Sequence, residues 1–316
     1  MYTSVTQTTL PALGRFIWIP VLILAVSVGA SPGDRVIAQF APNAMFIEGS
    51  PSFSPDGSRL AFGARDGRNL RGNVAHLWVG STSGNFQKVY AQPVRHVQFI
   101  SNQEIAFQDM AAATSGSRDM VVRAYNLNSG QVRELYRRTP AVRNGWDYEI
   151  LNLFAISSTG AYMVLQDPSG FAVIRFQDGA RLTASDFQVS FDRNSRVIFS
   201  TDDSRVLVFE GRSGAFSLYA IGAASLQKVD MATPNLSGLA PSSYFQLNGN
   251  GNMLLTAEQC SGDCYYQVFH FNTGTGAVQS VGTIRGGQIV SLGIGRDLRL
   301  IVRNVMHRQL ILTPVQ

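Results

Sequence analysis

The sequence is poor in the residue types that mark metal proteins and many enzymes. Its 316 residues include only two cysteines and four histidines, and 15% of the residues are charged. The histidines are dispersed without metal-ligand spacing, and a second cysteine pair is missing, so the common zinc motifs are excluded. The phosphate-binding loop and the dinucleotide fingerprint are missing as well. We therefore expect no metal site and no cofactor.

Lysine and helical periodicity are equally scarce. Only Lys88 and Lys228 are lysines among 26 basic residues, and the formal net charge is +5. Past residue 30, no segment sustains a 3.6-residue period. The stretch Gly80-Ser81-Thr82-Ser83-Gly84 has threonine where a nucleophile elbow requires serine. These features predict an all-β chain without a compact catalytic motif, and no nucleic-acid partner is expected.

Long hydrophobic runs are limited to one, Phe16 to Ala30, which follows Arg15. This run of 15 residues is shorter than the about 20 apolar residues that span a bilayer. The small residues Val28-Gly29-Ala30 suit signal-peptide cleavage, so residues 1–30 are interpreted as a signal peptide and the protein as periplasmic or secreted. The alternative is an uncleaved membrane anchor over residues 16–30, which would be the chain's only membrane contact.

What the sequence does contain is a repeated turn motif, strongest at residues 53–62. Pro55, Asp56 and Gly57 supply the fixed φ, the local acceptor and the positive φ of a tight turn between two strands. The best copy is Phe199 to Val208, and weaker copies start at Phe99, Ile156, Leu247 and Ile294. The spacings are 46, 57, 43, 48 and 47 residues. Four short strand patterns per repeat of this length predict a six-bladed β-propeller of four-stranded antiparallel blades.

The Phe53-Ser54-Pro55-Asp56-Gly57 motif gives the chain its family resemblance. It resembles the WD40-like repeat of the TolB-like six-bladed propellers, and the likeness spans roughly residues 44–316. The resemblance implies propeller kinship. Because the motif is structural, it transfers no functional residue.

The first and last parts of the chain are expected to meet. The last repeat supplies three strand patterns before the chain ends, and an unclosed propeller would expose a sheet edge. We expect residues 49–316 to form the six-bladed propeller. Residues 31–48 contain two apolar patches, 36–38 and 44–47, either of which could supply the missing strand.

The two cysteines, Cys260 and Cys264, lie close together in the fifth repeat. In a secreted protein such a pair is typical of a disulfide, here one that joins a hairpin. The spacing is not Cys-x-x-Cys, so a redox motif is disfavoured. His96 opens an expected inner strand, where it is either a structural histidine or a residue that faces the central channel.

Long loops are expected on one face of the propeller, in its first three repeats. Loops 64–74, 109–119 and 137–149 are rich in arginine and carry a tryptophan, a composition typical of protein interfaces and anion sites. The candidate partner-binding residues are Arg68, Arg71, Arg137, Arg138, Arg143 and Trp146. We interpret the protein as a non-catalytic protein-binding scaffold of the cell envelope that binds an acidic protein or an anionic envelope component. The alternative is a propeller enzyme, hydrolase or lyase, with its site at the channel mouth.

Overall fold

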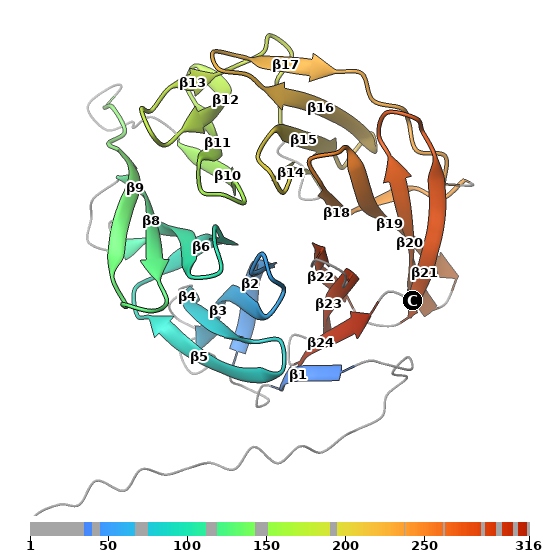
Figure 1. Cartoon of the computed structure of the whole chain (residues 1–316), viewed down its shortest axis with the longest axis horizontal. Coiled ribbons are helices and arrows are strands. Elements are labelled where there is room, and N and C mark those ends of the chain that lie inside the picture. The colour runs from blue at the N-terminus through green and yellow to red at the C-terminus, as the bar shows by residue number, and fades with distance from the viewer. Residues whose placement is uncertain are drawn as a thin grey trace, which may run out of the picture.

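Antiparallel strands make up nearly all regular structure in the computed structural model, which describes residues 35–39, 45–66, 75–111, 119–142, 151–189, 195–236, 238–261, 263–285, 288–294, 299–305 and 309–314. Five sheets are each built from four consecutive strands, and they follow one another around a ring (Figure 1). The first strand of each sheet is innermost and the fourth is outermost. The protein is therefore an all-β propeller of four-stranded antiparallel blades.

The five continuous blades are numbered in chain order. The first contains β2 (Met45–Phe53), β3 (Arg59–Asp66), β4 (Ala75–Ser81) and β5 (Gly84–Tyr90). The second contains β6 (Val94–Phe99), β7 (Glu104–Asp109), β8 (Met120–Asn126) and β9 (Val132–Arg138). The third contains β10 (Asn152–Ile156), β11 (Tyr162–Asp167), β12 (Gly170–Arg175) and β13 (Arg181–Leu182). The fourth contains β14 (Arg196–Phe199), β15 (Arg205–Glu210), β16 (Ala215–Ile221) and β17 (Leu226–Val229), and the fifth contains β18 (Pro241–Leu247), β19 (Asn252–Ser261), β20 (Asp263–Asn272) and β21 (Val278–Arg285).

A composite sheet occupies the gap between the fifth and first blades. It is formed by β22 (Gln288–Ile294), β23 (Arg299–Val305), β24 (Gln309–Pro314) and the N-terminal strand β1 (Arg35–Gln39). β1 pairs antiparallel with β24 on the outer side, so this sheet brings the described four-stranded sheets to six. The last repeat of the sequence therefore does not build a sheet by itself. Of the two apolar patches, 36–38 lies in β1, whereas residues 45–47 of the second patch lie at the start of β2, which begins before the expected boundary at residue 49.

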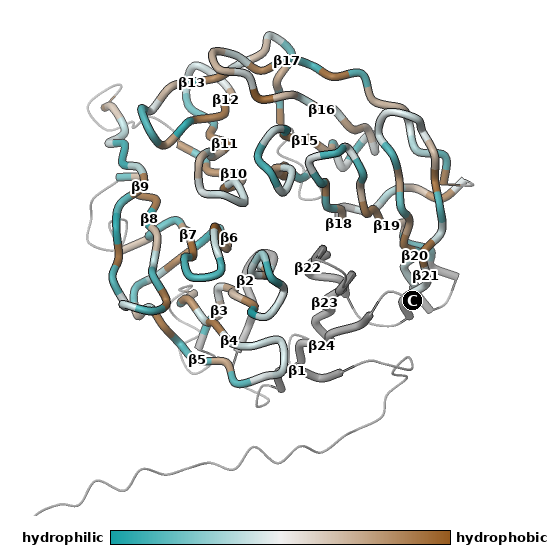
Figure 2. The backbone as a smooth tube through the Cα atoms, in the orientation of Figure 1, coloured by the Kyte–Doolittle hydropathy of each residue, from teal (hydrophilic) through white to brown (hydrophobic). Residues whose placement is uncertain are grey.

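The described core lies between neighbouring blades. Second strands are buried on both faces: Met163 to Leu165 are buried in β11, and Val206 to Phe209 are buried in β15. Outer strands such as β9 are largely exposed. Figure 2 shows hydrophobic stretches in each of the coloured sheets around the ring. Separate hydrophobic clusters join the first blade to the second, the second to the third, the third to the fourth and the fourth to the fifth.

The repeated motif owes its shape to one buried serine and one aspartate. In the first blade, Ser54 donates to the Asp56 carboxylate at 2.6 Å and its Oγ accepts from the Arg59 backbone N–H at 2.9 Å. The hydrogen bond from Ser54 is the main reason that the pKa of Asp56 is lowered. Ser200 makes the same two contacts in the fourth blade, with Asp202 and Arg205. The motif therefore encodes a turn that supplies its own acceptors.

The fourth residue of this turn has a positive φ in four blades. It is 70° at Gly57, 71° at Gly160 and 78° at Gly251, and the fourth blade places Asp203 there at 57°. An L-residue in this region is strained. Asp203 compensates by reaching the third blade, where its carboxylate accepts from the backbone N–H groups of Ser158 at 2.9 Å and Thr159 at 3.2 Å, and from the Thr159 hydroxyl.

We expect two replacements of Asp203 to distinguish the cost of its backbone strain from the contribution of its hydrogen bonds to the third blade. Asp203→Gly relieves the backbone strain but loses three charge-assisted hydrogen bonds, and should lower the free energy of unfolding by about 2 kcal/mol. Asp203→Ala loses the same bonds and retains the strain, so its loss should be about 3 kcal/mol. Urea unfolding of both variants measures the difference, and equal losses would contradict the strain argument.

The cysteine pair is placed by the backbone register of β19 and β20. Cys260 lies directly opposite Cys264, while the side chains of both are outside the described part of the structure. Residues directly opposite on antiparallel strands bring their Cβ atoms to about 5 Å, close to what a disulfide needs. The register is thus compatible with the expected bridge, which stays a prediction.

A disulfide between Cys260 and Cys264 should leave no reactive thiol in the oxidised protein. Because the closed loop is short, the bridge should contribute about 2 kcal/mol, the low end of the usual range. The measurement is maleimide labelling in denaturant without reductant, with a reduced sample as the control that must gain two labels. Labelling of both cysteines before reduction would refute the bridge.

Candidate partner-binding face

The loop face of the propeller is the side that carries the b–c and d–a connections, which join the second strand of a blade to its third and one blade to the next. Of the predicted residues, Arg137 and Arg138 are described, and both lie at the end of β9 rather than in the loop expected at 137–149. Arg68, Arg71, Arg143 and Trp146 lie outside the described residues. The expected loop therefore starts two residues later, and its two leading arginines sit on a strand.

Arg138 connects the second blade to the third. Its Nη1 lies 2.7 Å from Oδ2 of Asp167, the last residue of β11, and Arg181 of the third blade approaches Oδ1 at 3.1 Å. The Ser169 backbone N–H also donates to Oδ1 at 2.9 Å. The Asp167 side chain is only 4% exposed. Burial alone would raise the pKa of Asp167, but the hydrogen bonds from Arg138 and Ser169 and the charge of Arg181 lower it.

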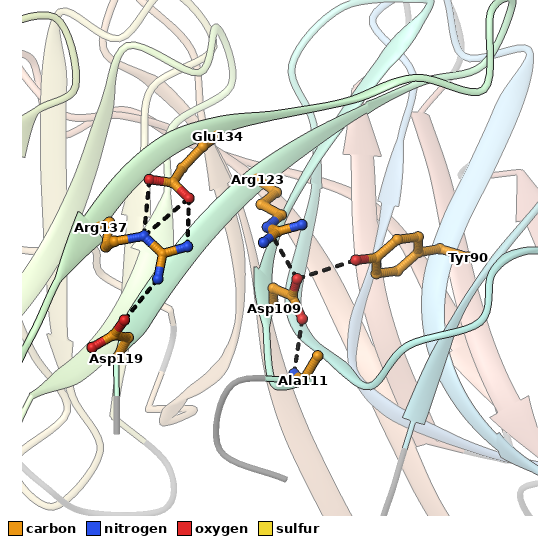
Figure 3. A network of polar contacts seen from close by, with 7 residues as sticks. All are labelled: Tyr90, Asp109, Ala111, Asp119, Arg123, Glu134 and Arg137. Carbon is orange, nitrogen blue, oxygen red and sulfur yellow. Dashed lines mark hydrogen bonds and ion pairs between the residues drawn. The ribbon is translucent and has the colours of Figure 1, made fainter. Parts of the chain in front are cut away.

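A related seam joins the first blade to the second, around Asp109 at the end of β7 (Figure 3). The Tyr90 hydroxyl donates to Oδ2 at 3.1 Å, and Nε of Arg123 lies 3.1 Å from the same oxygen. The Ala111 backbone N–H donates to Oδ1 at 2.8 Å. Burial, followed by the Asp109 charge, raises the pKa of Tyr90. In each seam, the last residue of an outer strand reaches a buried aspartate of the next blade.

Arg137 forms a separate cluster with two carboxylates (Figure 3). Its Nη1 lies 2.7 Å from Asp119 and its Nη2 lies 2.7 Å from Glu134. These hydrogen bonds raise the pKa of Arg137 and lower that of Glu134. Thr139 donates to the second oxygen of Asp119 at 2.8 Å. The described part of the predicted site is therefore an oriented arginine held between two carboxylates, rather than an unpaired positive patch.

An apolar side chain lies beside this cluster in the sequence. Val142 follows β9 on the connection to the third blade, and it is 55% exposed. In the described part of the chain it is the one large hydrophobic residue found exposed. Sequence reasoning missed it because a single valine in a loop carries no pattern.

The inner strand β6 carries the histidine that opens the second blade. His96 has a φ of 49° and lies within a bulge, where two residues of β6 face one residue of β7. His96 as a whole residue is exposed, yet desolvation by the surrounding protein, assisted by the Arg95 charge, lowers the pKa of its imidazole to about 4. His96 is therefore neutral at pH 7.

Within the described residues, two classes of feature are not found. No group of three or more histidine, cysteine, aspartate or glutamate side chains is arranged to hold a metal ion. Nor does this part of the chain contain a helix with the length and apolar character that a membrane crossing requires.

Comparison with known proteins supports the architecture alone. No family model and no curated protein matches the sequence. A solved structure of unknown function from Bacteroides thetaiotaomicron is 11% identical with a TM-score of 0.53, covering 90% of this chain and 76% of its own. A luciferin-regenerating enzyme is also 11% identical, with a TM-score of 0.52, covering 90% of this chain and 95% of its own. At these identities the likeness shows the fold and no function.

TolB from Acinetobacter baumannii is also among the similar structures. It is 13% identical with a TM-score of 0.48, and the match covers 83% of this chain. The chain spans 64% of that TolB structure's length.

Proposed function

We propose that this chain is a secreted or periplasmic TolB-like β-propeller that acts as a non-catalytic protein-binding scaffold in the cell envelope. The Phe53-Ser54-Pro55-Asp56-Gly57 repeat supports the TolB-like assignment, and the apolar run over residues 16–30 supports export. The sixth blade in this proposal is the composite sheet that β1 completes.

The observation that carries the binding role is the exposed Val142, which follows the oriented Arg137 by five residues on the loop-face connection. Arginine fixed by carboxylates loses little further freedom on binding, and an exposed apolar residue close to it in the sequence is the composition of an interface core. Arg143 and Trp146 follow directly in the sequence and would extend the same surface. The partner class is an acidic protein surface or another anionic envelope component, which the guanidinium of Arg143 and the aromatic anchor Trp146 would recognise. We assign Arg138 to the seam with Asp167.

The test is photo-crosslinking from the proposed surface in the native envelope. A crosslinking residue in place of Val142 should capture one discrete partner. The matched control is the same residue in place of Asn128, which is exposed on the short-turn face of the same blade. Arg137→Gln and Trp146→Ala should each reduce capture from position 142 by about tenfold, because anchor residues dominate interfaces. Equal capture from both positions, or capture that neither variant reduces, would place the partner surface elsewhere.

A further inference from the structure

The start of the innermost strand of the second blade carries two accessible polar side chains. β6 contacts the inner strands β2 and β10 on either side, so its first residues lie beside the central axis of the ring (Figure 1). Arg95 and His96 are nevertheless exposed, whereas Val94 and Phe99 at the two ends of the strand are buried. Because the first strand residues follow a d–a connection, this accessible site lies on the loop face.

The backbone here departs from regular pairing, as the inner strands β2, β10, β18 and β22 also do, but among their described residues only β6 adds a non-glycine residue at positive φ, His96. Arg95 pairs with Gln108 and Gln98 pairs with Ala106, so His96 and Val97 together face only Phe107. A histidine at positive φ costs energy that glycine would avoid, and such strain is concentrated at functional sites. The bulge turns the residues at its centre away from the direction that a regular strand would give them, a use of bulges that is common beside binding sites.

Arg95 differs from most of the described arginines in having no protein partner. Arg133, Arg137 and Arg138 of the same blade all form ion pairs with carboxylates. In the part of the chain that the structure describes, the Arg95 side chain forms neither an ion pair nor a hydrogen bond, and its charge lies close enough to His96 to lower the pKa of the imidazole. The site thus offers a free guanidinium and a neutral imidazole, with one positive charge in total.

We propose that Arg95 and His96 form a binding site for a carboxylate group at the loop-face mouth of the central axis. The planar guanidinium can donate two parallel hydrogen bonds to a carboxylate, and the neutral imidazole can donate one more. A single positive charge matches a carboxylate better than it matches a phosphate dianion. The carboxylate could belong to a small organic acid or to an acidic side chain of a peptide.

Titration of the purified chain with succinate tests this site by NMR of labelled histidine side chains. Succinate should shift the His96 resonances in a saturable manner, and Arg95→Gln should weaken the affinity about tenfold through the loss of charged hydrogen bonds. Arg212→Gln is the matched control, because Arg212 is exposed in a turn of the fourth blade and its replacement removes the same charge. That control should bind succinate as the unchanged protein does.

Two further variants distinguish a loss of succinate binding at this site from a loss of folding and from an effect of the proposed partner surface. His96→Asn tolerates the same positive φ and should keep the fold while weakening succinate binding. Val142→Asp should leave succinate binding unchanged, so failure of the partner surface and failure of this site give different results.

A glutamate-rich peptide that binds at least tenfold more tightly than succinate, with the same dependence on Arg95, supports the site and points to a protein source, whereas equal affinities support it and point to a small acid. Absence of any His96 shift, equal binding by Arg95→Gln, or tighter binding of inorganic phosphate than of succinate would overturn the proposal.

Discussion

Replacement of Asp167 by alanine should lower the free energy of unfolding by about 4 kcal/mol, because it leaves two arginines at a seam without their shared carboxylate. The carboxylate is 4% exposed and is approached by Arg138 from the second blade and Arg181 from the third. The loss should appear as a fall in melting temperature of about 10 °C, measured by differential scanning calorimetry.

The matched control is Asp178→Ala in the same blade. Asp178 also pairs with an arginine, Arg175, at 2.7 Å, but its side chain is 48% exposed. Solvent-exposed pairs contribute little, so the control should melt close to the unchanged protein. Equal shifts in the two variants would show that burial of the seam carboxylate does not matter.

The stabilisation of the fold by the Asp167 carboxylate should decrease as the solution becomes acidic. Its pKa in the folded protein is lowered from the usual 3.8, so the folded state binds the proton less readily than the unfolded chain does. The stabilisation is therefore complete above the usual value and is lost as the pH falls through the lower, folded-state pKa. The difference in stability between the unchanged protein and Asp167→Ala should be constant from pH 7 to pH 5 and should narrow in more acidic solution.

The strands and turns could be predicted because they are encoded locally. In the first blade the turn expected within residues 53–62 lies between β2, which ends at Phe53, and β3, which begins at Arg59. Serine, aspartate and glycine at fixed offsets make each turn almost independent of its surroundings. Because the motif is local, the fourth repeat could be recognised even though Asp203 stands where the first repeat has a glycine.

The contacts across the seams could not be predicted, because they join residues that no local pattern relates. Arg138 and Asp167 are separated by 29 positions and lie in different blades. A signal does exist: Gln108-Asp109 and Gln166-Asp167 end equivalent strands in consecutive repeats, and both aspartates are buried. From the sequence alone, Arg138 cannot be distinguished from Arg137. In the structure the two arginines contact different carboxylates.

The choice between the two N-terminal patches was open for a similar reason. Both are apolar, and strand pairing depends on which segment reaches the free edge of β24. The bulge between Glu48 and Ser52 lets β2 continue back to Met45, which commits the second patch to the first blade. The first patch then pairs with β24, with Arg35 opposite Leu312 and Gln39 opposite Gln309.

Deletion of residues 1–40 should open the ring and produce the other large effect. It removes β1 and leaves the backbone groups of β24 without a partner on the outer side. Loss of about four inter-strand hydrogen bonds at about 1 kcal/mol each should lower the melting temperature by about 10 °C. An exposed strand edge also pairs readily with other chains, so light scattering should detect oligomers or aggregates.

Deletion of residues 1–30 is the control, since it retains Arg35 to Gln39 and should melt as the unchanged protein does. A synthetic peptide spanning residues 33–41, added in excess to the longer deletion, should restore part of the lost stability by occupying the β24 edge. A longer deletion that stays monomeric and equally stable would mean that β1 is dispensable. The three strands β22 to β24 would then be sufficient to close the propeller, although β1 also contacts the outer strand β5 of the first blade.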